Sequence, residues 1–158
     1  MAVQLPGRFA DDLADIAIDS GGLPWVPNGQ GLAFKPLHFS PSTGTWWNLI
    51  RVERRGVISR HLHVGGAVHG YVLEGAWRYR EHEWTATPGT YVFEPPGDVH
   101  TLEVVSDEAM VTLFCVEGLI QYLDDDDNIV QQDDLRSRRR AYLDYCREHG
   151  IEPTALAI

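Results

Sequence analysis

Turn-forming residues interrupt the middle of this chain at short intervals. They include Pro41-Ser-Thr-Gly44, Gly65-Gly66, Glu74-Gly75, Pro88-Gly89 and Pro95-Pro-Gly97. The short segments between such turns predict an all-β domain. The strands that we predict cover residues 33–40, 45–54, 57–63, 68–73, 76–80, 83–86, 90–94, 100–105, 109–116 and 119–123. Strands at this density fit a jelly-roll barrel or a related double-sheet sandwich.

Two helices are expected outside the strands. Residues 8–18 can form a short amphipathic helix, and a Gly/Pro-rich arm follows it, so that residues 1–32 precede the barrel at 33–123. Residues 124–158 are expected to form an acidic loop and a C-terminal helix packed on the barrel. Because the chain has 158 residues, it is too short for two ordinary domains and is expected to form one.

The C-terminal helix has clear predicted limits. Asp133 or Asp134 can cap a helix that runs from Leu135 to His149 and ends at Gly150. One stripe of this helix carries the residues that are expected to pack on the barrel, namely Leu135, Arg139, Tyr142, Leu143 and Cys146. The basic run from Arg136 to Arg140 is expected to be a solvated helix face rather than an interaction tail.

Three histidines indicate a metal site. His61 and His63 lie two residues apart in a predicted strand, so their side chains point to the same face. His100 follows the turn Pro95-Pro-Gly97 and can bring a third imidazole to the same ion. Such a site suits Fe, Zn, Ni, Cu or Mn and leaves coordination positions open for chemistry. An isolated His-x-His pair is as often a surface or satisfied core feature, so the argument depends on the spacing of all three histidines.

That spacing resembles the two signature motifs of the cupin superfamily. The second motif matches closely, from Gly89 through Pro95 and Gly97 to His100. The first departs from the pattern, because Gly56 is one residue closer to His61 than usual and Val68 occupies the position of the usual glutamate. Val104 replaces the closing asparagine of the second motif. The resemblance therefore covers three ligands and gives no fourth.

Within this superfamily, the chain resembles the small cupins of the 2,4'-dihydroxyacetophenone dioxygenase family. The likeness spans most of residues 30–145 and includes Ser59-Arg-His61-Leu-His63 and Pro88-Gly-Thr-Tyr-Val-Phe-Glu-Pro-Pro-Gly-Asp-Val-His100. It implies a mononuclear non-haem iron enzyme that uses O2 to cleave a carbon–carbon bond beside a carbonyl. It also implies that His61, His63 and His100 hold Fe(II), with Zn, Ni and Mn as alternatives.

Other residues are candidates for roles around the metal. Glu81, Glu94 and His69 are the candidate catalytic acids or bases, although most glutamates are simply solvated and His69 should point away from the inward face of its strand. An ion held by three neutral histidines keeps its full charge, which favours an anionic, bidentate oxygen ligand. The aromatic residues Trp77, Tyr79 and Tyr91 are the candidate substrate pocket; the alternative for each is a place in the core or a subunit interface.

Three functions remain open from the sequence. The first is a dioxygenase whose partners are O2 and a small, aromatic hydroxy-ketone-like substrate. The second is another metal-dependent enzyme in the same barrel, such as an isomerase, lyase or cyclase, because fold and ligands do not dictate the reaction. The third is a non-catalytic cupin that senses a metal or a small molecule, as in the ChrR-like sensor cupins. A homodimer or higher homo-oligomer is expected in each case.

Composition excludes several partners. The net charge of -10 argues against nucleic acid, since phosphate binding needs clustered Lys and Arg. No apolar stretch approaches the roughly twenty residues that cross a bilayer, so no membrane association is expected. Cys115 and Cys146 give neither a disulfide framework nor a Cys-x-x-Cys unit, and the amino terminus lacks a basic, apolar leader. We therefore expect a cytoplasmic protein with reduced thiols.

Overall fold

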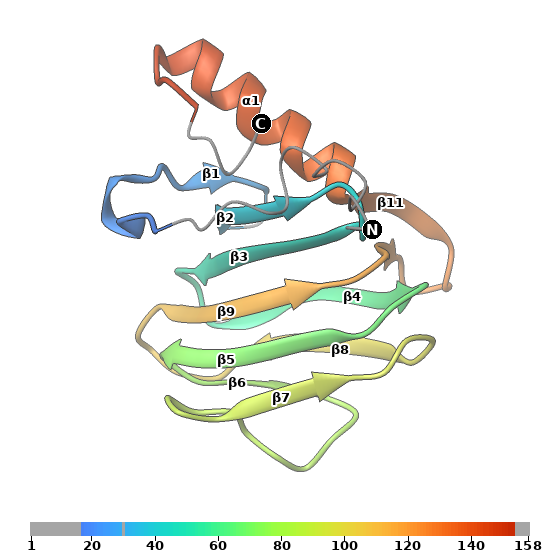
Figure 1. The fold of residues 1–158 in the computed structure, drawn as a ribbon. Coiled ribbons are helices and arrows are strands. Elements are labelled where there is room, and N and C mark those ends of the chain that lie inside the picture. Colours follow the sequence, from blue (N-terminus) through green and yellow to red (C-terminus); the bar gives the residue numbers. More distant parts are fainter. Residues whose placement is uncertain (1–16, 30, 154–158) are drawn as a thin grey trace, which may run out of the picture.

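The structure is a computed structural model that describes residues 17–29 and 31–153. Two antiparallel sheets face each other, with β3, β9 and β5 in the near layer and β4 and β8 in the far layer of Figure 1. The first sheet has the order β1 (Val26–Pro27), β2 (Leu32–Ser40), β3 (Thr45–Val52), β9 (Met110–Val116), β5 (Val68–Glu74) and β7 (Tyr91–Glu94). The second has the order β11 (Ile129–Asp134), β10 (Leu119–Leu123), β4 (Gly56–Val64), β8 (Val99–Val104) and β6 (Trp77–Tyr79). The predicted all-β jelly-roll fold is confirmed.

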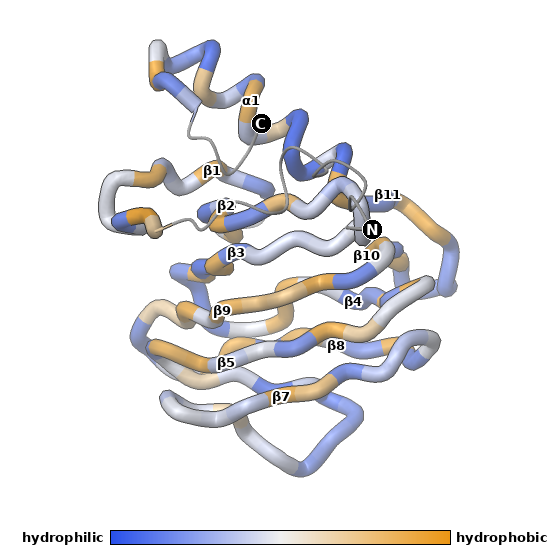
Figure 2. The backbone as a smooth tube through the Cα atoms, in the orientation of Figure 1, coloured by the Kyte–Doolittle hydropathy of each residue, from blue (hydrophilic) through white to orange (hydrophobic). Residues whose placement is uncertain are grey.

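The core fills the space between the two sheets. Buried residues alternate along β6, β7 and β8, whereas nearly all of β9 is buried, and hydrophobic residues are prominent along β5 and β9 in Figure 2. Phe34, Trp46 and Trp77 are almost completely buried. The Trp77 indole N–H donates to the Thr112 hydroxyl at 2.9 Å, so the buried polar atom of this large side chain is satisfied. The inner faces therefore form one core, with the histidines of β4 at its edge.

The predicted strands agree with the observed ones apart from residues 83–86, where only Ala86 forms an isolated bridge, to Trp77. Two strands were not predicted: the two-residue β1 lies in the segment expected to be an irregular arm, and β11 lies in the segment expected to be an acidic loop. The residues of β11 are mostly polar and exposed, and it is an edge strand that pairs with β10. Because edge pairing uses backbone groups, no apolar alternation marks it in the sequence. The helix predicted over residues 8–18 falls almost wholly outside the described residues.

The C-terminal helix α1 (Leu135–His149) begins and ends as predicted. Asp134 caps it in a capping box with Ser137, and Gly150 ends it in the left-handed conformation at φ 64°. The helix contacts β11, β2 and β1 along one side of the barrel (Figure 1). No helix in the described part of the chain has the length and apolar character that crossing a bilayer requires.

The buried face of α1 differs from the predicted stripe at one position. Arg138, rather than Arg139, is buried together with Leu135, Tyr142 and Cys146. Arg138 lies three residues after Leu135 and four before Tyr142, so it shares their face of the helix. The interpretation of the whole basic run as a solvated face is therefore wrong at Arg138, which is 3% exposed.

Candidate metal centre

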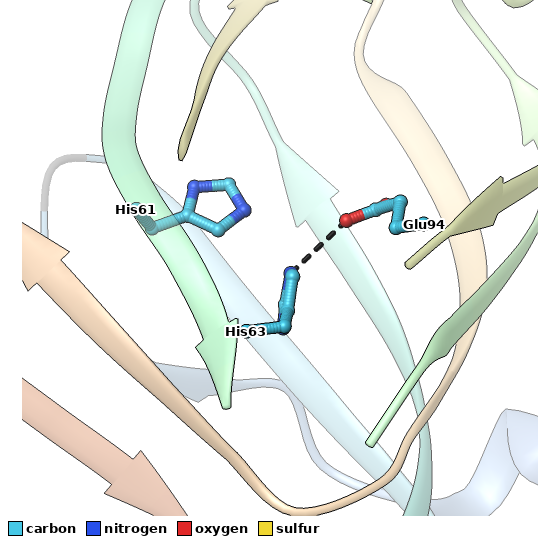
Figure 3. Close-up of side chains that lie close together, drawn as sticks. All are labelled: His61, His63 and Glu94. Carbon is cyan, nitrogen blue, oxygen red and sulfur yellow. Dashed lines mark ion pairs between the residues drawn. The ribbon is translucent and has the colours of Figure 1, made fainter. Parts of the chain in front are cut away.

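Three buried side chains converge between the two sheets. His61 and His63 come from β4, and Glu94 comes from the end of β7. One ligand atom from each lies within 4.8 Å of the others. Figure 3 shows the three side chains pointing toward one another. Their exposed fractions are 6%, 3% and 2%, so the cluster is shielded from bulk water.

Strand alternation and one turn place these side chains. In β4 both histidines face inward, as their spacing predicts. In β7 the same alternation leaves Phe93 outside and turns Glu94 inward. The turn that follows is tied to β4, because the Gly97 N–H donates to the His63 carbonyl at 2.8 Å. Gly97 has a φ of 98°, a conformation that favours glycine. The turn thus holds the end of β7 close to His63.

Glu94 lies opposite the position of the missing glutamate of the first cupin motif. That motif position holds Val68, and Val68 is the direct cross-strand partner of Glu94 in the β5–β7 ladder. Side chains directly opposite each other on neighbouring strands lie on the same face, with Cβ atoms about 4.5–5.5 Å apart. The carboxylate therefore reaches the inner face from the strand beside the expected one.

The chemistry of the cluster fits a divalent transition metal. His63 Nε2 lies 3.0 Å from Glu94 Oε2, but the pair does not have the geometry of a hydrogen bond. Both carboxylate oxygens of Glu94 and Nδ1 of His63 are buried without a hydrogen-bond partner. Buried polar atoms are normally paired. Unpartnered nitrogen and oxygen atoms on neighbouring side chains therefore indicate that a shared ligand, such as a metal ion, pairs with them. Imidazole and carboxylate are ligands for Fe, Zn, Mn and Ni.

Protonation also favours metal binding. Burial, together with the neighbouring His63, lowers the pKa of His61 from 6.5 to about 4, so His61 is neutral near pH 7. Burial by itself would raise the pKa of Glu94, but contact with His63 and the charges of both histidines bring it below its ordinary value. Ser59 Oγ lies 3.2 Å from His61 Nδ1 and can fix the orientation of the ring. The cluster therefore presents an available imidazole nitrogen and a carboxylate.

His100 lies beside this cluster without joining it. It sits on β8 directly opposite His61, and the two ring centroids are 6.1 Å apart. Its ring stacks on Tyr79 at 4.4 Å, and both of its nitrogens are buried without partners. Burial lowers the pKa of His100, which keeps the ring neutral. Its predicted role as a third ligand stays a prediction.

The other candidate acids and bases are placed differently from Glu94. Glu81 lies in an exposed turn after β6, where its carboxylate accepts a hydrogen bond from the Thr101 backbone N–H at 2.9 Å. His69 follows the inward-facing Val68 on β5, so alternation places it on the outer face. There its Nδ1 lies 2.7 Å from the Tyr91 hydroxyl. The structure brings neither Glu81 nor His69 into the cluster.

The three candidate pocket residues occupy three environments. Tyr79 is buried and lines the cavity next to the histidines. Trp77 is completely buried in the core. Tyr91 is 59% exposed on the outer face. Side chains alternate along β7, so Tyr91 points outward like Phe93 and away from the side of Glu94. Of the three, Tyr79 is the one that faces the cavity.

The cavity adjoining the histidines has a volume of about 70 Å³. A single water needs about 10–15 Å³ by this kind of measure, so several waters or a small organic ligand fit. Its walls are mainly apolar, with a few polar groups. The lining residues are Leu32, Trp46, Asn48, Ile50, Ser59, His61, His63, Val68, Tyr79, Leu102, Phe114, Val116, Ile120, Tyr122 and Arg138.

Sequence reasoning assigned no role to several polar residues of this lining, Tyr122 and Arg138 among them. Tyr122 comes from β10 and Arg138 from α1. Tyr122 is paired with His61 across the β4–β10 ladder, and strand parity offered a weak signal for it. Arg138 stands in a basic run that resembles a solvated face, and its place depends on how α1 packs on the barrel. Its helical spacing to Leu135 and Tyr142 was the one available signal.

A double-sheet jelly roll with inward-facing histidines on neighbouring strands defines the cupin class, and this chain has that fold with a candidate metal centre inside it. The profile described as the ChrR Cupin-like domain matches residues 13–121, and the chain belongs to that family. No curated protein sequence matches the chain.

Solved structures agree with this assignment. An RmlC-like cupin protein from Ralstonia eutropha JMP134 is 30% identical, with a TM-score of 0.87 over 96% of this chain and 99% of that one. An acetylacetone dioxygenase from Acinetobacter johnsonii shares the fold at 20% identity, with a TM-score of 0.71 over 91% of this chain and 99% of that one. ChrR, the anti-sigma factor bound to SigE from Rhodobacter sphaeroides, matches at 18% identity, with a TM-score of 0.53 over 61% of this chain and 50% of that one.

Proposed function

We propose that this protein is a mononuclear non-haem Fe(II) dioxygenase that cleaves a carbon–carbon bond beside a carbonyl. The substrate is a small hydroxy-ketone-like molecule, with an aromatic group only if the cavity widens to admit it. The observation that carries the proposal is the convergence of His61, His63 and Glu94, with unpartnered donor atoms, beside a mainly apolar cavity. The acetylacetone dioxygenase that shares the fold supports the same reaction class.

The overall reaction balances without a further reductant. A hydroxy-ketone R–CO–CH2OH and O2 give R–COOH and formic acid: one carbon–carbon bond breaks, and each carbon of that bond gains one oxygen atom. The substrate loses four electrons and O2 gains four. Bound iron would supply the Lewis acidity and the redox activity that this exchange needs. His61, His63 and Glu94 would hold it, and His100 is the further predicted ligand.

The protein's own residues would bind and orient the substrate. The apolar walls exclude water, while Tyr79 remains a neutral phenol because burial and the nearby Glu94 raise its pKa well above 10. A carboxylate has two oxygens, so Glu94 can hold the ion through one and accept a proton from the substrate hydroxyl through the other, since its lowered pKa keeps it ionised near neutral pH. In this proposal Glu94 therefore replaces Glu81 and His69 as the principal candidate base.

The deciding experiment is oxygen uptake by protein reconstituted anaerobically with Fe(II). Parallel samples carry Zn, Ni or Mn, and the substrates are small and aromatic α-hydroxy-ketones together with short 1,3-diketones. We expect uptake with iron alone, one O2 per substrate cleaved, and two carboxylic acids from a hydroxy-ketone. The absence of uptake from a fully iron-loaded protein with every substrate would refute the proposal.

A non-catalytic sensor is the second candidate, because the family is defined by the ChrR Cupin-like domain. A sensor would bind a metal with high affinity and consume neither O2 nor substrate. Turnover without O2 in the Zn, Ni or Mn sample would instead favour an isomerase, lyase or cyclase. A homo-oligomer and a cytoplasmic location stay predictions; sedimentation of the purified protein and microscopy of a tagged chain test them.

A further inference from the structure

The cavity continues past His61, away from the metal cluster. Strand β4 lies between β8 and β10, and His61 is paired with His100 on one side and with Tyr122 on the other. Tyr122 therefore lies on the side of His61 opposite to His100. Arg138 of α1 contacts Tyr122 there, and both residues line the cavity. A metal cluster thus borders one end of the cavity and a buried guanidinium borders the other.

Arg138 is held firmly in place. Its Nη2 donates to the Tyr122 hydroxyl at 2.8 Å and pairs with Asp133 at 2.9 Å. With the Asn28 amide oriented so that its oxygen faces Arg138, that oxygen accepts from Nη1 at 2.9 Å. The guanidinium lies 5.0 Å from the centroid of the Phe34 ring. A side chain fixed in this way can offer its remaining N–H groups with little loss of conformational entropy.

One of these remaining groups has no acceptor. Nε of Arg138 is buried and makes no hydrogen bond with any residue that the structure describes. Leaving a buried donor unpaired costs about 1–3 kcal/mol, and more for a charged group. Nε itself is enclosed, so a ligand oxygen in the cavity, which Arg138 lines, can meet this donor only after a small rotation of the side chain.

The buried charges indicate what kind of oxygen this is. The residues concerned are Glu94 at the metal end and the ion pair of Arg138 with Asp133 at the other end. With a divalent ion bound, the ion carries two positive charges and Arg138 carries one. Glu94 and Asp133 carry one negative charge each, so the sum is one positive charge. Uncompensated charge is costly in a poorly hydrated interior, so a ligand with a single negative charge is favoured.

We propose that Arg138, positioned by Tyr122 and Asp133, anchors a carboxylate of the ligand, so that the natural ligand is a small monocarboxylate with an apolar body. Its opposite end would carry the oxygen groups that meet the metal, as in a short oxo- or hydroxy-carboxylate. The metal half of this inference rests on the proposed function, whereas the anchor half rests on the contacts of Arg138. Arg138 and Tyr122 are thus a binding residue and a positioning residue.

Calorimetric binding of butanoate and pentanoate, compared with butanamide and pentanamide, tests the anchor. The full-length protein is used both metal-free and loaded with zinc, which is redox-inactive. A hydrogen bond to a charged group contributes about 1.5–3 kcal/mol, so we expect each carboxylate to bind about tenfold or more tightly than its amide. The preference should be present in the metal-free protein, where Arg138 alone supplies it, and larger in the zinc-loaded protein, whose added positive charge also favours an anion.

Variants assign the preference to Arg138. R138Q should lose it, Y122F should weaken it by a few-fold because the guanidinium is held less firmly, and R136Q should leave it unchanged, since Arg136 is exposed on the same helix. Circular dichroism checks the folding of each variant. If R138Q does not fold, the carboxylate preference is measured in Y122F and R138K instead. Both variants keep a positive charge at residue 138, and R138K lacks the planar group of N–H donors that arginine has, so it should reduce the preference.

Three outcomes overturn the anchor. They are equal binding of amides and carboxylates, undiminished carboxylate binding by folded R138Q, and carboxylate binding that requires zinc, which would mean coordination to the metal instead. None of these measurements involves O2. Loss of oxygen uptake with an intact carboxylate preference would refute the dioxygenase alone, and the reverse result would refute the anchor alone.

Discussion

The two ends of the cavity are built in different ways. At the metal end, His61, His63 and Glu94 are fixed by strand alternation and one glycine turn, and several of their polar atoms have no partner. At the anchor end, Arg138 and Tyr122 are joined through hydrogen bonds and an ion pair that link α1 to the second sheet. The metal end thus leaves buried polar atoms unpartnered, whereas most polar groups at the anchor end are paired and support the fold.

Removing a histidine ligand should produce the largest effect. H61A or H63A should abolish stoichiometric binding of Fe(II) or Zn, because each removes one of the converging ligand atoms. Metal content after dialysis, measured by atomic emission, checks this expectation. H149A is the matched control, since His149 is exposed near the end of α1. Full metal occupancy in both H61A and H63A would show that the site assignment is wrong.

Glu94 should contribute less to metal affinity than a histidine ligand does, but more than an exposed carboxylate does. E94Q should lower metal affinity by about 10–100-fold, whether Glu94 binds the ion directly or orients His63. Competition with a chromophoric chelator measures the change. E81Q, which alters an exposed carboxylate in the turn after β6, should stay within error of the unmodified protein. Equal affinities for E94Q and E81Q would remove Glu94 from the metal end.

H100A tests whether the metal end extends to β8. Because both nitrogens of His100 are unpartnered and its strand pairs with β4 at His61, we expect about tenfold weaker metal binding. The same chelator assay applies, with H149A again as the control. An unchanged affinity would leave His100 as a stacking partner of Tyr79 and restrict the centre to β4 and β7.

The anchor end should contribute more than the metal end to the free energy of unfolding. Both side chains of the Arg138–Asp133 pair are almost fully buried, so R138Q should lower the free energy of unfolding by about 3–5 kcal/mol. The double variant D133N/R138Q should regain part of this loss, since it no longer leaves a carboxylate unpaired. Urea denaturation of metal-free protein measures both, with E94Q as a comparison from the metal end. A loss in E94Q as large as that in R138Q would contradict the division of roles.

Tyr122 should make a smaller contribution, which appears as a loss of stability at alkaline pH. Burial raises the pKa of Tyr122 above its ordinary value of 10. The charge of Asp133 also raises this pKa, whereas that of Arg138 lowers it. Above pH 10 the unfolded chain therefore loses this proton before the folded protein does, so stability falls as the pH rises toward the folded pKa. Urea midpoints at pH 9 and pH 11 should differ less in Y122F than in the unmodified protein. An identical fall in both would mean that Tyr122 does not contribute.

The same division explains what could be predicted from the sequence. Strand positions and the inward direction of His61 and His63 follow from turn residues and alternation, which are local properties. The polar edge strand β11 has no such signal. Helical spacing puts Arg138 on the face of Leu135 and Tyr142, but an arginine in a basic run is normally solvated, so the helix sequence alone did not predict its burial. Its burial depends on partners that lie far away in the sequence, such as Asn28 and Tyr122.

The ladder between β5 and β7 has a wider consequence. Val68 occupies the place in the linear pattern where an acid is usual, and the paired position on the next strand holds Glu94. Two hydrogen-bonded neighbours can present a side chain to the same part of a barrel interior. A search that requires every acid of the linear motif would find the first motif incomplete, although the family profile matches the chain. A search that also reads the residue opposite each motif position would retain it.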